Sequence, residues 1–487
     1  MKKKLFVFLI PIVLITISLL PRKENKELVS NTDNLVSFTV DGVESKTMPT
    51  KGSGYIANKI TCKNGSIITF DNDNYIIEVE KLESADACKI DFSKEKGSNT
   101  VTVTISDTSK IDSTSKTTTE GGKVVFYLTG EPESITGGEY TLSSNKLIVN
   151  NIISNINLNI TMSKTLYDQL LIDNSRIKTR TDFDTTFTET NTGTLYKANE
   201  SIVGNTPKDV YYFAGDAKNN WVKFGGFYWR IIRTNYDGSI RLLYSGTSHN
   251  TTEGYIGKSA FNSTFKDPMY VGYMYGTSGS LDSNRTNTNN STIKTYIDNW
   301  YNNNLSSYSK YISTEAVYCN DRELAQGSTY KTGNTTFDYA PRGRLDTNKT
   351  PAYNCTNIKD AFSGSNSEAK LTYPIGLMTA DEVAYAGGKA FTNLPSPYAW
   401  YYLNSAGGSI TGSTYWYSLS PIYWYGSFSW VWGVAGSDNT GYLGRNDVLG
   451  SLAVRPVISL KSCTLYSTGN GAPETPYEIV LDPDISC

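Results

Sequence analysis

The sequence predicts a multidomain, β-rich protein in which small all-β modules precede a larger domain of mixed strands and helices. A length of 487 residues suggests about three domains. Asn, Ser, Thr, Gly and Tyr are abundant, a composition typical of secreted proteins rich in strands and loops. Apolar residues alternate along several short segments before residue 163, and helical periodicity begins only after it.

The N-terminal segment has the pattern of an export signal. Lys2, Lys3 and Lys4 precede an apolar run over residues 5–20. No small-x-small cleavage site follows the run, so we interpret residues 1–27 as an uncleaved signal anchor, with a cleaved signal peptide as the alternative. In either case we expect the rest of the chain to lie outside the cell, held at the membrane or secreted.

The six cysteines form three local pairs along the chain. In an oxidising compartment an even number of cysteines with such spacing favours disulfides. We prefer sequential pairing because each pair falls within one segment. The expected bridges are Cys62–Cys88, Cys319–Cys355 and Cys463–Cys487. A zinc site is disfavoured, since the chain has no CxxC motif and His249 is the only histidine.

Two β modules are predicted ahead of the large domain. Residues 28–93 hold short apolar or alternating runs separated by Gly and Asp/Asn turns, and Cys62 and Cys88 would link them. Residues 94–165 hold further alternating strands, of which NINLNITM is the clearest. We expect this second module to be a β-sandwich that acts as a spacer. It resembles the small immunoglobulin-like or grasp-like repeats that form stalks on Gram-positive surface proteins.

A short helix and a linker are predicted between the modules and the large domain. TLYDQLLIDNS has helical character, and the polar stretch after it has too few apolar residues to build a core of its own. We therefore assign residues 166–205 to a helix and a linker, with a strap over the next domain as the alternative for the polar stretch.

The large domain is predicted to span residues 206–463, with a disulfide-tied tail over 464–487. Its first clear element is a hairpin, because Asp237-Gly238 separates two β-like runs. VRPVISL is expected to form the last strand of the domain.

Two helices are predicted inside this domain. The first, over residues 291–305, has apolar residues at helical spacing, namely Ile293, Tyr296, Ile297, Trp300 and Tyr301. The second, over residues 378–388, begins with Thr379, and Glu382 follows at the position that completes a capping box.

Several segments of the large domain form a recognisable series: NNWVKFGGFYWRIIRTNYDGSIRLLYSG, STIKTYIDNWY, LTYPIGLMTADEVAYAGG, YWYSLSPIYW and VRPVISLKSC. The series resembles a large family of surface-exposed domains of unknown function in gut Firmicutes, over residues 206–487. Members of that family usually carry an N-terminal anchor and β modules, so the resemblance implies a bacterial, Gram-positive surface protein.

A more distant likeness concerns the fold. LMTADEVAYAGG is similar to a helix of formylglycine-generating enzymes and related C-type-lectin-like domains. The resemblance implies an α+β C-type-lectin-like fold with long loops for residues 206–463. Those enzymes bind copper through a cysteine pair near the final strand, and residues 400–455 contain no cysteine. The resemblance therefore does not imply their oxidase activity.

The stretch STYWYSLSPIYWYGSFSWVW, residues 413–432, contains nine aromatic residues and no charge. Because alternate side chains of a strand point to opposite faces, we expect some rings to lie in the core and others near the surface. Flat exposed rings stack on sugars or on peptides. The candidate ligand-binding residues are Trp416, Tyr423, Trp424, Tyr425, Trp430, Trp432, Arg445 and Asn446.

The remaining motifs limit the possible functions. The sequence contains no P-loop, HExxH or GxSxG motif, so we predict no enzymatic activity. A net charge of −2 without a basic block argues against nucleic acid as a partner. Calcium is the one metal that the sequence leaves open, with Asp438, Asn439 and Asp447 as candidate ligands through their side-chain oxygens.

The predicted function is therefore recognition of a glycan or of a host or cell-surface partner by an anchored extracellular protein. Two alternatives stay open at this point. One is a divergent enzyme built on the formylglycine-generating-enzyme fold, and the other is a purely structural surface protein.

Overall fold

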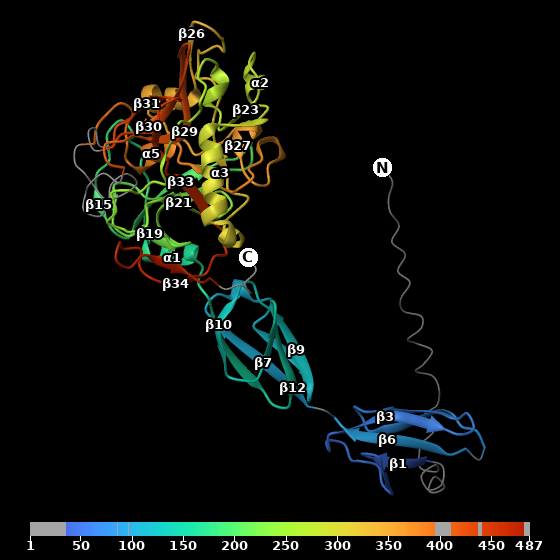
Figure 1. Cartoon of the computed structure of the whole chain (residues 1–487). Helices are drawn as coiled ribbons and strands as arrows, with labels where there is room; N and C mark the ends of the chain where they lie inside the picture. Colours follow the sequence, from blue (N-terminus) through green and yellow to red (C-terminus); the bar gives the residue numbers. More distant parts are fainter. Residues whose placement is uncertain (1–35, 85, 96, 395–410, 437–440, 482–487) are drawn as a thin grey trace, which may run out of the picture. The chain divides into compact units, whose positions relative to one another are not determined.

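The structure, a computed structural model, describes residues 36–84, 86–95, 97–394, 411–436 and 441–481. The chain divides into two compact units, Met1–Thr161 and Met162–Cys487, and strands dominate both (Figure 1). The prediction of a multidomain, β-rich protein is confirmed. No helix among the described residues is long and apolar enough to span a membrane. The signal or anchor predicted over residues 1–27 lies outside the described residues.

The first module of the N-terminal unit contains a four-stranded sheet in the order β2-β1-β6-β3 and a separate hairpin of β4 and β5. Its strands are β1 (Val36–Val40), β2 (Val43–Ser45), β3 (Tyr55–Cys62), β4 (Ile67–Asp71), β5 (Ile76–Lys81) and β6 (Cys88–Lys94). Ile68, Ile90 and Phe92 form its small core. Cys62 and Cys88 lie opposite each other on β3 and β6 and form the predicted disulfide.

The second module has two sheets, β10-β13-β7-β8 and β11-β12-β9. Its strands are β7 (Ser98–Ile105), β8 (Ser115–Thr119), β9 (Gly122–Tyr127), β10 (Pro132–Thr136), β11 (Thr141–Ser143), β12 (Lys146–Ile152) and β13 (Ile156–Met162). Val101, Val103, Leu158 and Ile160 are buried, and the Thr and Asn residues between them are exposed. The alternation in the sequence therefore identifies the inner face of these strands correctly.

The large unit is built on a ten-stranded sheet whose main path runs β14-β16-β17-β20-β19-β35-β34. Strand β21 pairs with β20 and β33, and β33 pairs with β28. The strands are β14 (Arg176–Lys178), β16 (Thr194–Glu200), β17 (Lys208–Tyr212), β19 (Trp221–Phe224), β20 (Phe227–Thr234), β21 (Ile240–Tyr244), β28 (Gly376–Leu377), β33 (Pro456–Leu460), β34 (Tyr466–Thr468) and β35 (Tyr477–Ile479).

A six-stranded sheet in the same unit runs β22-β32-β29-β30-β31, and β26 pairs with β29. Its strands are β22 (Lys258–Ser259), β26 (Thr335–Asp338), β29 (Trp416–Gly426), β30 (Phe428–Val434), β31 (Leu443–Asp447) and β32 (Leu452–Ala453). Short strand pairs complete the unit: β15 (Thr190–Asn191) with β18 (Asp216–Ala217), β23 (Met274–Tyr275) with β24 (Asn289–Asn290), and β25 (Tyr318–Cys319) with β27 (Ala361–Phe362).

The helices of the large unit are α1 (Leu166–Asp173), α2 (Leu281–Asn284), α3 (Thr292–Asn304), α4 (Ala340–Arg342) and α5 (Ala380–Ala386). The two predicted helices of the domain are confirmed as α3 and α5. Ile293, Ile297 and Tyr301 form the buried face of α3. Thr379 and Glu382 make the predicted capping box at the start of α5.

The structure corrects the prediction that residues 176–205 are a linker. Residues 176–205 contribute β14 and β16 to the ten-stranded sheet, and the predicted tail contributes β34 and β35 to it. Leu195 and Tyr196 are buried although polar residues surround them in the sequence. Low apolar content thus misled the prediction, because a strand that joins an existing sheet needs only a few apolar side chains, and here Leu195 and Tyr196 pack on opposite faces of β16.

Candidate functional site

The aromatic stretch forms the hairpin of β29 and β30, which turns at Gly426 with φ +69°. In its register Tyr425 lies opposite Phe428, and Tyr423 lies opposite Trp430. These four rings therefore share one face of the sheet, and Trp424 points to the other.

Three of the candidate binding residues lie in the core. Trp416, Trp424 and Trp432 each have an exposed fraction of 0 %. Trp424 Nε1 donates a hydrogen bond to the Gly333 carbonyl at 3.0 Å. The ring of Phe391 covers Trp432, with 5.3 Å between centroids. These tryptophans fill the interior of the fold, so a ligand at the surface cannot contact them and their prediction as binding residues is wrong.

Tyr425, Phe428 and Trp430 form a partly exposed surface, which we call the aromatic platform. Tyr425 is 63 % exposed and Phe428 is 39 % exposed, whereas Trp430 is half-buried. Phe265 stacks on Phe428 with 4.6 Å between the ring centroids. The platform therefore presents rings to solvent whose positions are fixed by neighbouring aromatic side chains.

Tyr423 lies beneath this platform and is only 4 % exposed. Its ring centroid is 5.8 Å from that of Trp430 and 6.1 Å from that of Tyr425. It is thus a support for the platform rather than a contact surface, which corrects its assignment as a ligand-contacting residue.

Two arginines flank Tyr423. Arg445 Nη1 donates a hydrogen bond to the Tyr423 hydroxyl at 3.1 Å, and the Arg445 guanidinium lies 5.8 Å from the Trp430 ring centroid. The Arg342 guanidinium lies 4.9 Å from the Tyr423 ring centroid and also pairs with Asp338 at 2.6 Å. Arg445 is exposed and makes no ion pair within the described part of the chain. The edge of the platform therefore carries an available positive charge.

Asn446 points away from this surface. It follows Arg445 on β31 and lies opposite Val431, a fully buried residue of β30. Its Nδ2 lies close to the position that a Cβ on Gly433 would occupy, which places the amide against the β30 backbone. Asn446 is therefore also removed from the platform.

The structure gives no support to a calcium site at Asp447. Its Oδ1 accepts a hydrogen bond from the Leu449 amide at 2.9 Å, which is a turn contact. Asp438 and Asn439 lie outside the described residues. Within the described ranges, the one cluster of potential metal ligands is Cys62, Asp86 and Cys88, and both of these cysteines are in a disulfide.

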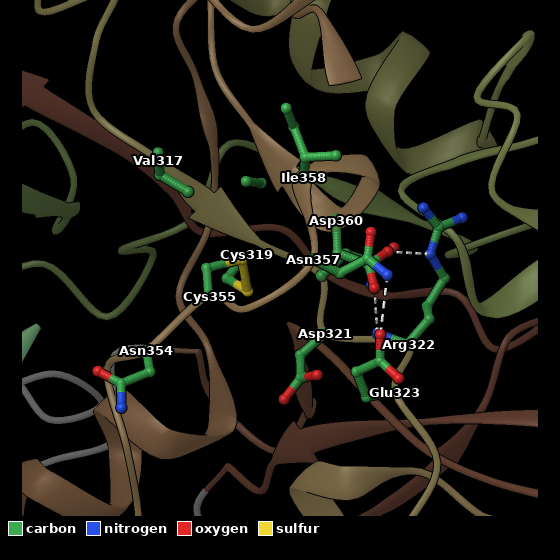
Figure 2. The surroundings of a disulfide bond; sticks show 12 residues. Val317, Cys319, Asp321, Arg322, Glu323, Asn354, Cys355, Asn357, Ile358 and Asp360 are labelled. Carbon is green, nitrogen blue, oxygen red and sulfur yellow. Dashed lines mark hydrogen bonds and ion pairs between the residues drawn. A yellow bond between two sulfur atoms is a disulfide. The ribbon is translucent and has the colours of Figure 1, made fainter. Parts of the chain in front are cut away.

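The large unit also contains the Cys319–Cys355 disulfide. The Cα atoms of the two cysteines are 5.7 Å apart. This pairing was predicted and is confirmed, whereas Cys487, the expected partner of Cys463, lies outside the described residues. Figure 2 shows Val317 and Ile358 on one side of the bridge and Asp321 on the other.

A buried ion network lies in the same unit. Glu382 Oε1 pairs with Arg233 Nε at 2.8 Å and with Arg241 Nε at 2.7 Å, and Glu200 Oε1 pairs with Arg233 Nη2 at 3.0 Å. All four side chains are at most 4 % exposed. Burial by itself would raise the pKa of Glu382, but Arg241 and Arg233 hold this pKa below its ordinary value.

Asp321 is a strained and buried acid beside this network. Its φ is +35°, in a region that few residues other than Gly adopt. Burial raises the pKa of Asp321 to about 6, although Arg344 Nη2 lies 2.7 Å from its Oδ2. The folded protein therefore binds a proton here more tightly than the unfolded chain does.

Replacing Asp321 by Asn is expected to change how stability depends on pH. The raised pKa stabilises the fold below about pH 4, and this stabilisation of about 3 kcal/mol is lost as the pH rises through about 6. Asn tolerates the same backbone conformation and does not titrate. Urea unfolding of both proteins between about pH 4 and 7 should show their stability difference changing by about that amount. A difference that is constant across this range would contradict the raised pKa.

Comparison with protein-family models, with curated proteins and with solved structures finds no match to this chain. The geometry of the large unit therefore carries the functional argument. Sequence reasoning recognised Tyr425, Trp430 and Arg445 but did not select Phe428, although alternation along the strand places Phe428 on the same face as Trp430. Arg342 comes from a distant segment, and no local pattern marks it.

Proposed function

We propose that the chain is an extracellular, membrane-anchored bacterial surface protein whose large unit binds a glycan through the aromatic platform. The observation that carries the proposal is that Tyr425 and Phe428 stay exposed while Trp424 and Trp432 on the same strands are buried. Leaving a large aromatic ring in water forgoes the free energy of burying it, which is of order 2 kcal/mol. Two such rings side by side on a supported surface are typical of recognition sites.

The chemistry of the platform suits a sugar. Aromatic faces stack on the apolar faces of pyranose rings, and Tyr hydroxyls add polar contacts at low entropic cost. Arg445 adds a positive charge without a carboxylate partner among the described residues. An acidic sugar would pair with this guanidinium, so we expect carboxylated or sulfated glycans to bind more tightly than neutral ones.

A C-type-lectin-like architecture and membership of the surface-domain family of gut Firmicutes belong to the same proposal. Its support is the order of elements: the β20–β21 hairpin, helix α3, helix α5 with its capping box, the aromatic hairpin and the final strand β33. Fold likeness by itself does not assign a function, and the proposal of binding therefore depends on the platform.

Binding of the intact chain to an array of neutral and acidic glycans tests this proposal. We expect saturable binding, with Tyr425→Ala and Arg445→Gln each weakening it about tenfold. Tyr140→Ala is the matched control, because this tyrosine is 42 % exposed and lies in the other unit. Two results would favour a structural role for the large unit instead. In one, the protein binds no glycan on the array; in the other, Tyr425→Ala binds as strongly as the wild-type protein.

A further inference from the structure

The large unit contains a cleft of about 470 Å³ that is separate from the aromatic platform. Four segments line it: the loop after β16, the turn between β20 and β21, residues 315–317, and residues 358–366. Its volume falls within the range of small-molecule sites in proteins.

One wall of the cleft is apolar. Ile202, Val203, Val317 and Ile358 line it, and two of them are unusually exposed for their type, Val203 at 37 % and Ile358 at 43 %. Figure 2 shows Val317 and Ile358 on the same side of the disulfide. An apolar body placed in the cleft would remove these side chains from water.

Backbone hydrogen bonds join the segment that carries Val203 to Cys355, one of the two bridged cysteines. The Val203 amide donates to the Cys355 carbonyl at 2.7 Å, and the Cys355 amide donates to the Ser201 carbonyl at 2.9 Å. Val203 has φ +48°, which is a strained conformation for a β-branched residue. Strain of this kind persists where the surrounding structure fixes the backbone, and it is concentrated at functional sites.

The other side of the cleft offers hydrogen-bond acceptors. Asp237 and Glu315 line it, and neither carboxylate has a cationic partner within the described ranges. Among the described residues, Asp237 accepts hydrogen bonds from neutral groups, namely Ser239 and the Ser313 hydroxyl. The Asn235 side chain is 5 % exposed, and its Oδ1 receives no hydrogen bond from the described residues. This side of the cleft therefore favours a ligand that donates hydrogen bonds and carries positive charge.

One cation is already present at the edge of the cleft. The Lys208 ammonium lies 4.2 Å from the ring centroid of Tyr236 and donates to the Tyr236 carbonyl at 3.4 Å. It forms no ion pair with a carboxylate in the described part of the chain. The positive charge of Lys208 would repel a second cation, so its removal provides a direct test of the sign of the ligand.

We propose that this cleft binds a ligand in which a protonated amine is attached to a compact apolar body. An ammonium group has three donors and no acceptor, which matches Asp237, Glu315 and Asn235. The apolar body packs against Val203, Val317 and Ile358. The site is independent of the proposed glycan surface, and either can fail without the other.

The test is a ligand-observed NMR titration of the intact protein with three probes. Isoamylamine carries the charge and the apolar body, isoamyl alcohol keeps the body without the charge, and glucosamine keeps an amine on a hydroxylated body. We expect isoamylamine to bind about tenfold more tightly than isoamyl alcohol. We also expect isoamylamine to bind more tightly than glucosamine. Ile358→Ala should reduce this difference between isoamylamine and glucosamine.

Charge variants show where the amine binds. Glu315→Gln should weaken isoamylamine about threefold, because this exposed carboxylate is partly screened, and Lys208→Met should strengthen it by a similar factor. Glu474→Gln is the matched control, since Glu474 is 72 % exposed and does not line the cleft. Neither Glu315→Gln nor Lys208→Met removes a buried contact, so both proteins should keep the wild-type unfolding temperature.

Three outcomes would overturn the proposal. They are the absence of saturable binding of isoamylamine, equal affinity for the amine and the alcohol, and an equal loss of binding in Glu315→Gln and Glu474→Gln. Tighter binding of glucosamine than of isoamylamine would assign the cleft to an amino sugar and would also contradict the apolar contact proposed here.

Discussion

Replacing Trp424 by Ala is expected to lower the free energy of unfolding of the large unit by about 3–5 kcal/mol. The Trp424 side chain is fully buried and lies opposite Phe337, a buried residue of β26. Removing it leaves a cavity that the paired strands cannot close. It also removes one of two hydrogen bonds that the Gly333 carbonyl accepts, and the Thr335 amide at 2.7 Å remains as the other donor.

Denaturant unfolding followed by near-ultraviolet circular dichroism measures this effect. Tyr425→Ala is the matched control because Tyr425 is the next residue on the same strand and is 63 % exposed. Its substitution should change stability by about 1 kcal/mol or less. A loss in Trp424→Ala no greater than that of the control would mean that Trp424 is not part of the core.

Replacing Glu382 by Ala is also expected to destabilise the large unit by about 3–5 kcal/mol. The substitution leaves the buried guanidiniums of Arg233 and Arg241 without the carboxylate that both contact. It also removes half of the capping box at the start of α5, since Glu382 Oε2 accepts from the Thr379 amide at 2.9 Å.

The same network predicts that the stability of the large unit depends on pH. Because the pKa of Glu382 is held below its ordinary value, its contribution is present at neutral pH and is lost as the pH falls through that lowered pKa. Glu478→Gln is the control, because Glu478 is 47 % exposed and pairs only loosely with Lys223 at 3.7 Å. It should change stability by less than about 1 kcal/mol. Equal effects of the two substitutions in urea unfolding would contradict the network.

Local signals in the sequence located the elements that frame these sites. Asp237-Gly238 between two apolar runs identified the β20–β21 hairpin, since this dipeptide adopts the tight turn. Thr379 and Glu382 identified the start of α5, because capping requires these residue types at this spacing. The disulfide pairings Cys62–Cys88 and Cys319–Cys355 followed from proximity along the chain.

The aromatic hairpin was only partly predictable. Alternation along the strand separated Trp424 from its neighbours Tyr423 and Tyr425, as the register shows. It could not reveal that Trp432 is covered, because the covering ring of Phe391 comes from a different segment. Burial of one face of a strand depends on what packs against it, and that information is not local.

The cleft had no signal in the sequence. Its acceptors come from the β20–β21 turn and from Glu315, and its apolar wall comes from segments near residues 203 and 358. None of these segments carries a motif, and they are distant in sequence and meet only in the folded unit. Glu382 was recognised as a capping residue, but its pairing with Arg233 and Arg241 depends on the same long-range packing.

The division of adjacent aromatic residues between core and binding surface is tested most directly by the glycan affinity of Trp424→Phe and Tyr425→Ala, measured side by side on folded protein. We expect Trp424→Phe to bind with wild-type affinity despite reduced stability, and Tyr425→Ala to bind about tenfold more weakly at nearly unchanged stability. If Trp424→Phe lost affinity while Tyr425→Ala retained it, the exposed platform would not be the ligand-binding surface.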